Sequence, residues 1–359
     1  MWIPLLLGAA ILGEPPRFEG YTVTHWTPTS ALKDQQSTGT CWSFATTSFL
    51  ETESMRLGRP PVSLSPIFYV APAYREKAER FVSRKGKSYF ASGDLTFSVL
   101  EGYRRFGAVP EVAYNGIIKG DTRLDHLEMD DLLLAMVTSV GASGYGRIKP
   151  NAWRIAFDAT LAAYLGRPPS QFEFEGARYT PRSFADERVA IDPDKYVEVT
   201  SYSHLAANGF SPLEIPANYR KRRYLNLPFR DFARVVDVAL AAGFSLAWDG
   251  DVSEPGWKDA AGTAHLPDGV GVDAELRDRH FRSGKTADEH NMHLVGRATD
   301  ERNEVYYVLK NSEGPNANGG FVLMHREYLL LKTVSLLVHQ DALPADVRRR
   351  VRRLKPRGG

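Results

Sequence analysis

The spacing of hydrophobic residues changes along this chain, and that change constrains the fold more than any other feature. Before residue 244 apolar residues recur at helical spacing, and each such segment ends at a glycine. After it come short β-rich runs separated by Gly, Asn and Asp. The helical segments span 41–58, 95–107, 152–166 and 229–243, and the β-rich runs span 244–250, 290–298, 304–312, 319–329 and 333–340. We therefore expect an α+β fold in which a helical half precedes an antiparallel β-barrel-like half.

Cys41 is the only cysteine among 359 residues. An internal disulfide is therefore impossible, and the fold must be stabilised by its hydrophobic core. With 43% hydrophobic and 25% charged residues, the composition is that of an ordinary globular protein with a large core. The cysteine count leaves the redox compartment open.

An apolar run at the start of the chain bears on localisation. Residues 1–13, MWIPLLLGAAILG, end in small residues like the hydrophobic region of a secretory signal, but they contain no Lys or Arg. The run favours a secreted or periplasmic protein, with a cytoplasmic one as the alternative. It is too short to span a bilayer, and no later segment approaches about 18 uninterrupted apolar residues. No transmembrane segment is expected.

Positive charge is concentrated at the end of the chain. The formal net charge is +2, and residues 348–357 hold seven of the 45 Lys and Arg residues, so the rest of the chain is mildly acidic. We expect residues 346–359 to form a solvated basic tail. A second basic stretch, YRKRRY at 219–224, lies in no recognisable nucleic-acid-binding motif. No specific nucleic-acid partner is expected.

Cys41 lies in the first turn of the helix expected at 41–58. The thiolate is the reactive form of cysteine, and the positive end of a helix dipole and a nearby imidazolium both favour it. Gly39 permits a tight turn into the helix, Gln35 offers a side-chain amide donor, and Trp42 follows directly. A lone cysteine beside an apolar helix is otherwise a small buried hydrophobe. These neighbours favour a nucleophile.

A nucleophilic cysteine needs a general base and a group that orients the base. The segment DEHNMHLVG at 288–296 offers His290 and His293, and YYVLKNSEG at 306–314 offers Asn311. The two histidines are an odd number of residues apart, so a strand would turn them to opposite faces. Only one of them is expected to face the cysteine.

A metal site in this segment is the less favoured alternative. Asp288, Glu289 and the nearby His280 could join the two histidines as ligands. The spacing is not that of a helical H-E-x-x-H, and no further cysteine is present. We expect neither a metal nor any other cofactor.

Three blocks of this sequence, Q-x5-C-W-S-F-A, H-x-M-x-L-V-G and V-L-K-N-S-x-G, resemble the signature blocks of papain-like cysteine peptidases. They occur in the family's order, on a helix start and two β-rich runs. The resemblance implies that Cys41 is the nucleophile, that His290 is the base and then the acid, and that Asn311 orients the imidazole. It also implies that the Gln35 side chain and the Cys41 backbone N–H bind the oxyanion. The register of the second block selects His290, and His293 remains the alternative base.

The spacing of these blocks favours one branch of the family. Cys41 and His290 are 249 positions apart, whereas papain and the cathepsins have about 130–150, so roughly a hundred residues are inserted. The chain is more similar to the bleomycin hydrolase and aminopeptidase C branch. The segments AVPEVAYNG, YTPRSFA, SLAWDGDVSEPGW and LLLKTVSLLVHQDALP extend this likeness over about residues 25–345. The resemblance implies hydrolysis of peptide substrates through a thioester acyl-enzyme, aminopeptidase-type specificity, and a homo-oligomer, since relatives form hexameric rings.

The expected papain-like organisation has five parts, with an active-site cleft between the helical and β-rich halves. They are a possible signal or leader segment (1–20), the helical half with Cys41 (21–115), a mostly helical insertion (116–228), the β-rich half with His290 and Asn311 (229–345), and the basic tail (346–359).

Six residues are expected at the substrate cleft: Gly39, Trp42, Trp248, Asp249, Asp251 and Glu313. Glu313 departs from the family, because NSEG stands where relatives have NSWG, whose tryptophan shields the Asn–His hydrogen bond. A carboxylate there either raises the imidazolium pKa and admits water or points outward. The alternative function is therefore a catalytically impaired member that binds peptides or a partner.

The arginine-rich chain end is the second departure. In aminopeptidase C relatives the carboxy-terminal arm enters the cleft and enforces exopeptidase action. Here that segment ends in Gly358 and Gly359 after several arginines, so endopeptidase action also stays open.

Overall fold

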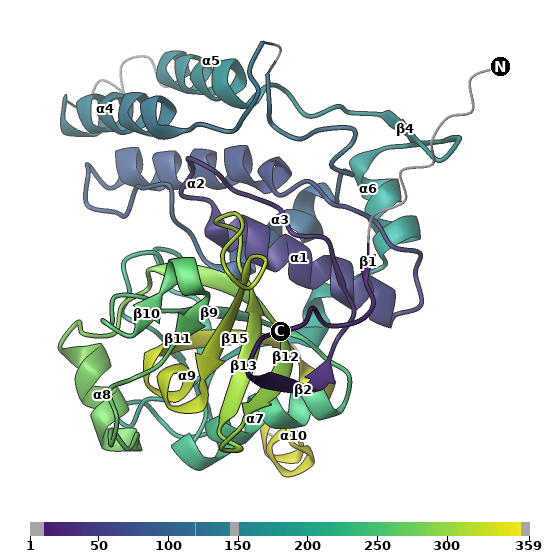
Figure 1. The fold of residues 1–359 in the computed structure, drawn as a ribbon. Helices are drawn as coiled ribbons and strands as arrows, with labels where there is room; N and C mark the ends of the chain where they lie inside the picture. The colour runs from purple at the N-terminus through teal and green to yellow at the C-terminus, as the bar shows by residue number, and fades with distance from the viewer. Residues whose placement is uncertain (1–10, 119, 144–150, 353–359) are drawn as a thin grey trace.

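The computed structural model describes residues 11–118, 120–143 and 151–352. In the view of Figure 1 a helical half lies above a sheet half. The helical half contains α1 (Cys41–Arg56), α2 (Val70–Ser83), α3 (Thr96–Phe106), α4 (Leu127–Ser143), α5 (Ala152–Leu165) and α6 (Pro181–Phe184). The sheet half carries α7 (Phe229–Ala241), α8 (Ala274–Arg282), α9 (Arg326–Lys332) and α10 (Ala345–Arg352). The four helices expected from the sequence are confirmed as α1, α3, α5 and α7.

Eleven strands form one large sheet. In sheet order they are β10 (Trp257–Lys258), β11 (Thr263–Ala264), β14 (Phe321–His325), β13 (Val305–Lys310), β12 (His290–Asp300), β9 (Leu246–Gly250), β15 (Thr333–His339), β6 (Tyr196–Thr200), β8 (Arg223–Asn226) and β7 (Gly209–Pro212), and β2 (Tyr21–Trp26) also pairs with β12. The pairs are antiparallel except for β11 with β14 and β6 with β8, which are parallel. Among the described strands these pairings form an open path.

Two small strand pairs lie outside the large sheet. One consists of β1 (Ile11–Leu12) and β3 (Thr29–Ser30), and the other of β4 (Phe172–Phe174) and β5 (Ala177–Tyr179). Single turns of 3-10 helix occur at Ile67–Tyr69, Pro193–Lys195, Asp259–Ala261 and Gln340–Ala342.

The insertion expected at 116–228 is helical only in its first part. It contains α4, α5 and the short α6, but residues 196–226 then supply β6, β7 and β8, which extend the large sheet beyond β15. The boundary between the two halves therefore falls before residue 196 rather than at 228. These strands are short, and they join the large sheet through β6, which pairs with β15 more than a hundred residues away along the chain.

Both ends of the described chain belong to the folded body. Phe18 is buried against Phe321, and Ile11–Leu12 pairs with Thr29–Ser30, so residues 11–18 of the expected leader contribute to the fold. Residues 346–352 of the expected solvated tail lie in α10, where Val347 is buried. Residues 1–10 and 353–359 lie outside the described residues.

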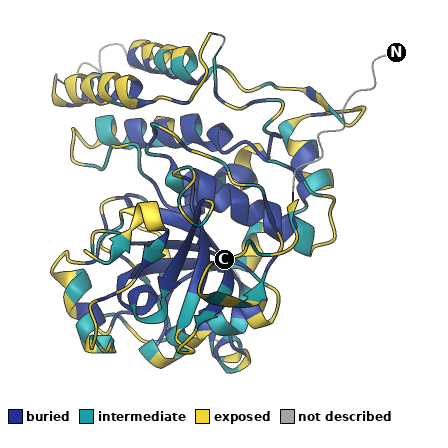
Figure 2. Cartoon of the chain, in the orientation of Figure 1, coloured by how far each residue is buried: buried dark blue, intermediate teal, exposed yellow. Residues whose placement is uncertain are grey.

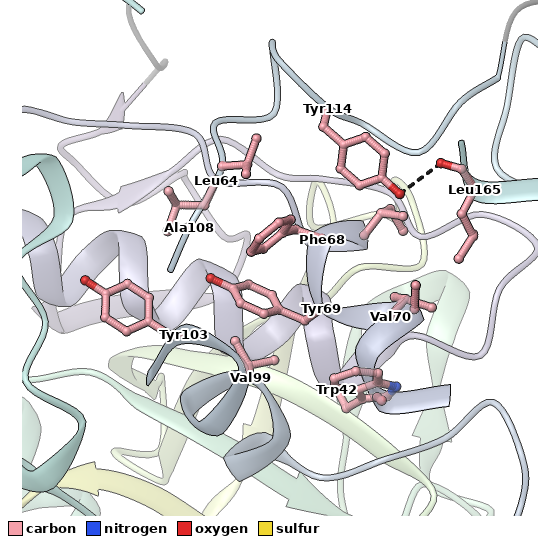
Figure 3. Packing of buried hydrophobic residues seen from close by; sticks show 14 of the residues in the cluster. Trp42, Leu64, Phe68, Tyr69, Val70, Val99, Tyr103, Ala108, Tyr114 and Leu165 are labelled. Atoms are coloured by element: carbon pink, nitrogen blue, oxygen red, sulfur yellow. Dashed lines mark hydrogen bonds between the residues drawn. The ribbon is translucent and has the colours of Figure 1, made fainter. Parts of the chain in front are cut away.

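Helix α1 is the central element, where the two halves meet (Figure 2). Every residue from Trp42 to Ser54 is buried, because α1 contacts α3 in its own half and β12 and β9 in the sheet half. A helix that is buried on all sides needs no polar face. Figure 3 shows the aromatic core beside it, where the Tyr114 hydroxyl donates to the Leu165 carbonyl at 2.9 Å and fixes the end of α5.

Candidate active site

Cys41 is the first residue of α1, and it is partly exposed although the next thirteen residues are buried. The backbone N–H groups of a first helical turn have no acceptor inside the helix, and they make this end electropositive. The approach to the helix is tight, since a Cβ at Gly39 would lie 2.7 Å from Ser92 Cβ. Gly39 has no left-handed φ, so glycine is required here by close approach rather than by a turn.

His290 begins β12 and brings its buried imidazole to Cys41. Nε2 donates to Asn311 Oδ1 over 2.7 Å, which leaves Nδ1 for the cysteine. Burial alone lowers the pKa of His290, but the hydrogen bond and the charge of Cys41, with a smaller contribution from Glu313, raise it to about 9. With such a pKa the imidazole of His290 is protonated at neutral pH.

Asn311 follows β13 directly and is fixed on both sides. Its backbone N–H donates to the Gly320 carbonyl at 3.0 Å, and its Oδ1 also accepts from the Ser312 backbone N–H at 2.8 Å. The amide is thereby held with its oxygen toward His290. An acceptor fixed in this way selects the ring orientation of the histidine.

Gln35 joins the loop before α1 to the loop after β13. Its backbone N–H donates to the Ser312 carbonyl at 2.7 Å, and its Oε1 accepts from Ser312 Oγ at 2.7 Å. Its Nε2 donates to the Thr38 carbonyl at 2.8 Å, which leaves the second amide N–H for a substrate oxygen. Gln35 is buried, so this orientation is defined by packing and by its hydrogen bonds to Ser312 and Thr38.

Glu313 faces the catalytic pair rather than pointing outward. Its Oε1 lies 3.9 Å from His290 Nδ1, and its Oε2 accepts from Asn311 Nδ2 at 3.3 Å. The side chain is nevertheless 42% exposed, so water reaches the charge. It also lines an open pocket of about 570 Å³ together with Asp34, Gln36, Arg123 and Asp259.

His293 does not reach this centre. It is fully buried, its Nδ1 lies 2.8 Å from Ser48 Oγ, and its ring packs edge-on against Phe49 of α1. Burial, with the charge of Lys310, lowers its pKa well below the usual range. The odd spacing along the strand, which turns the two histidines apart, was the sequence signal for this difference.

Four residues expected at the cleft have no exposed side chain, and that expectation was wrong for them. Trp42 is in the core, with Nε1 donating to the Ser92 carbonyl at 3.2 Å. Trp248 donates to Thr333 Oγ1 at 2.8 Å, and Asp251 pairs with Lys332 at 3.1 Å. Asp249, which follows Trp248 on β9, accepts from neighbouring strands. Central strands are buried on both faces, which a turn-like D-G-D pattern does not reveal.

The sequence analysis missed Asp288 as a site residue except as a possible metal ligand. Its carboxyl lines a second pocket of about 340 Å³ and is hydrogen bonded to buried Asp249. The only signal was its place two residues before His290. In the described ranges no group of three or more His, Cys, Asp or Glu side chains is arranged to hold a metal.

Within the part of the chain that the structure describes, no helix combines the length and the apolar character needed to cross a membrane.

No protein-family model and no curated protein matches the chain. Among solved structures, PepW from Lactobacillus rhamnosis HN001 (DR20) superposes with a TM-score of 0.71 at 16% sequence identity, covering 92% of this chain and 85% of PepW. Xylellain, a cysteine protease from Xylella fastidiosa, gives 0.40 at 15% identity over 90% of each chain. Digestive procathepsin L 3 from Tenebrio molitor larval midgut gives 0.41 at 14% identity, covering 92% and 72%. The fold assignment rests on the similarity to PepW, and the expected papain-like fold is confirmed.

Proposed function

We propose that this chain, which has a papain-like fold, is a cysteine peptidase that hydrolyses peptide bonds through a thioester acyl-enzyme. One observation carries the proposal: the partly exposed sulfur at the start of α1 is hydrogen bonded to His290, whose other ring nitrogen is bonded to Asn311. A nucleophile, a base and an orienting group in contact are the parts that acyl transfer needs.

In this proposal each step has its own group. The Cys41 thiolate attacks the peptide carbonyl carbon, and the carbonyl oxygen becomes an oxyanion that takes N–H donors from Gln35 and the Cys41 backbone. The C–N bond then breaks while the His290 imidazolium gives its proton to the leaving nitrogen. Water, deprotonated by the now neutral imidazole, attacks the thioester and releases the acid and the thiolate.

Aminopeptidase-type specificity is the finer part of the proposal. It rests on the sequence likeness to the aminopeptidase C branch. The described part of the basic segment, α10, packs on α7 through Arg350 with Asp231 and Arg234 with Asp346. Asp288 is considered below as an anchor for a substrate amino group.

Covalent labelling tests the peptidase proposal. An epoxide inhibitor of the E-64 kind should alkylate Cys41 in wild-type protein, as intact mass shows, and the Cys41→Ala variant should gain no mass. Peptide hydrolysis should stop in the same variant. Correctly folded wild-type protein that takes up no epoxide and cleaves no peptide in a mixed library would overturn the proposal.

The exposed carboxylate of Glu313 supports a second candidate, an impaired relative that binds peptides through the same site. Water reaching the Asn311–His290 hydrogen bond weakens it, since screening is stronger in a wet site. Glu313→Trp discriminates between the two. A large gain in hydrolysis from a negligible wild-type rate supports the impaired relative, and a wild-type protein that is already active excludes it.

A further inference from the structure

Asp288 stands in the segment that leads into β12, two residues before His290. It borders the pocket of about 340 Å³, whose wall is partly apolar, with Ile215, Pro216 and Phe281, and partly polar, with His204 and Glu214. The pocket thus presents a carboxyl group at one end of a surface that an aliphatic chain can cover.

Two further carboxyl groups stand close to Asp288. Asp249 is buried and accepts from Asn291 Nδ2 at 3.0 Å and Ser335 Oγ at 3.1 Å. Glu198 is buried on β6 and accepts from the Thr96 hydroxyl at 2.6 Å. Within the described residues neither of them, nor Asp288, has a Lys, Arg or His nitrogen within 4.0 Å.

Two arginines lie nearby, since Arg222 acts on Glu198 and Arg282 lines the pocket. Burial is nevertheless the largest effect on the pKa of each of the three carboxyl groups. Burial, together with Asp288, raises the pKa of Asp249 well above its usual range. Burial raises the pKa of Asp288 to about 6 and that of Glu198 to about 7. Buried carboxylates without a partner either hold protons or take a cation from outside.

Tyr224 is independent evidence that a partner is absent. Its hydroxyl is fully buried on β8 and has no hydrogen-bond partner among the described residues. Glu198, Asp249, Asp288 and Arg222 all act on it electrostatically, so this hydroxyl lies near the carboxyl cluster. A buried hydroxyl without a partner is uncommon and indicates a group that the site is built to receive.

Tyr89 connects this cluster with the nucleophile. Asp288, Asp94 and Cys41 all act on its hydroxyl, which donates to the Gly93 carbonyl at 3.3 Å. Together with its place two residues before His290, this puts Asp288 near the Cys41–His290 pair.

We propose that Asp288, backed by Asp249 and Glu198, is a specificity subsite that binds a protonated amine of the substrate peptide. The inference rests on the proposed function. An ammonium group supplies three N–H donors to carboxylates, and the apolar wall takes the carbon chain that bears it. The amine is either the amino terminus of the peptide or a basic side chain.

Four fluorogenic dipeptide amides distinguish these sources. Their first residue is lysine or norleucine, and their amino end is free or acetylated, so that one of the four carries no ammonium group. We expect wild-type kcat/KM to be at least about tenfold higher for a peptide with the recognised ammonium than for the uncharged one. A high kcat/KM for the free norleucine peptide identifies the amino terminus as the recognised group. A high kcat/KM for the acetylated lysine peptide identifies the basic side chain.

Asp288→Asn should reduce this preference to about twofold or less. The matched control is Glu289→Gln. It removes one negative charge from the next residue, whose side chain is exposed. Equal wild-type rates for all four peptides would overturn the inference and leave the peptidase proposal standing. An equal loss of preference in Glu289→Gln would also overturn it. The preference would then come from the overall negative charge of this region and not from a contact with Asp288.

Binding to the Cys41→Ala variant separates the two proposals. If no peptide is cleaved, calorimetric titration of the same four peptides still reports the subsite. A Kd that improves with the ammonium group, and that Asp288→Asn worsens, supports the subsite while the peptidase proposal fails. If the Kd is the same with and without the ammonium group, the subsite is rejected. The comparison of lysine with norleucine peptides does not depend on whether an Asp288 variant folds.

Discussion

At the scale of single residues, the charge of Glu313 is the feature that most affects the proposed chemistry. The pKa of His290 is raised to about 9, and Glu313 is one of the groups that raise it. A catalytic imidazolium with this pKa is protonated at neutral pH and loses its proton as the pH rises through about 9. The proposed acid is therefore available at physiological pH.

The first prediction concerns the pH profile. Activity should fall on the alkaline side with an apparent pKa of about 9, and Glu313→Gln should move that fall to lower pH, because removing a negative charge destabilises the imidazolium. The measurement is kcat/KM, or the rate of Cys41 alkylation, against pH. Since the folded pKa lies above the ordinary value of about 6.5, stability from this group is complete below that pH and is lost toward 9. An unmoved profile in Glu313→Gln would contradict the assigned cause.

That the residues of the proposed site are neighbours was predictable, because short sequence blocks identify them. The Gln35-to-Cys41 spacing and the order of His290 and Asn311 are local patterns, and the structure places these side chains together. The directions in which side chains point were less predictable. Trp42 follows Cys41, yet adjacent helix positions point about 100° apart, so it enters the core instead of a cleft. The carboxyl group of Asp288 gains its significance only from Asp249 and Glu198, which no local pattern links to it.

At the scale of elements, the position of Cys41 depends on how closely the loop before α1 approaches residues 92–93. A Cβ at Gly39 would lie 2.7 Å from Ser92 Cβ, and Trp42 bonds to the Ser92 carbonyl from the other side. The start of α1 is thus held by contacts that leave no space for a methyl group.

The second prediction tests this approach. Gly39→Ala should destabilise the protein by about 1–3 kcal/mol through overpacking and slow Cys41 alkylation by about tenfold or more through misplacement of the sulfur. Urea unfolding and timed mass spectrometry measure the two effects. Ser92→Gly in the same chain removes the clashing Cβ and should restore both. If Gly39→Ala alone behaves like wild type, the close approach is not a constraint.

The third prediction concerns α10, which was expected to be solvated. Val347 is buried against the core of the sheet half, so Val347→Ala should cost about 1.5 kcal/mol or more. The control is the exposed neighbour Arg349→Ala, which should stay within about 0.5 kcal/mol. If both variants have the same midpoint of urea unfolding, this segment is a solvated tail after all. The four arginines of α10 obscure a face with the buried Val347 and Val351, which composition alone does not reveal.

At the scale of the whole molecule, the candidate site exists only because the two halves dock. α1 brings Cys41 from one half, and β12 and β13 bring His290 and Asn311 from the other. The order of helical and β-rich segments predicted these halves, but the strands at 196–226 were expected to belong to a mostly helical insertion. Their membership is decided by pairing with β15, a contact between distant parts of the chain, and local periodicity carries no record of such a contact.

The last prediction concerns a lysine buried where the halves meet. Lys310 Nζ donates to the Ser30 carbonyl at 2.7 Å and to Ser48 Oγ at 2.9 Å, and burial lowers its pKa to about 7. Above pH 7 the unfolded chain binds a proton here that the folded chain does not, so this group makes stability rise with pH up to its ordinary value of about 10.4. The slope should be absent in Lys310→Met.

The measurement is the free energy of urea unfolding at about pH 7 and about pH 9.5 in both proteins. We expect the wild-type protein to gain on the order of 2 kcal/mol relative to Lys310→Met between these two conditions. Taking the difference between the proteins cancels the opposite contribution of His290, because that group is common to both. Parallel pH dependences would mean that the amine between the halves stays protonated, and that the halves dock around a charged lysine rather than a neutral one.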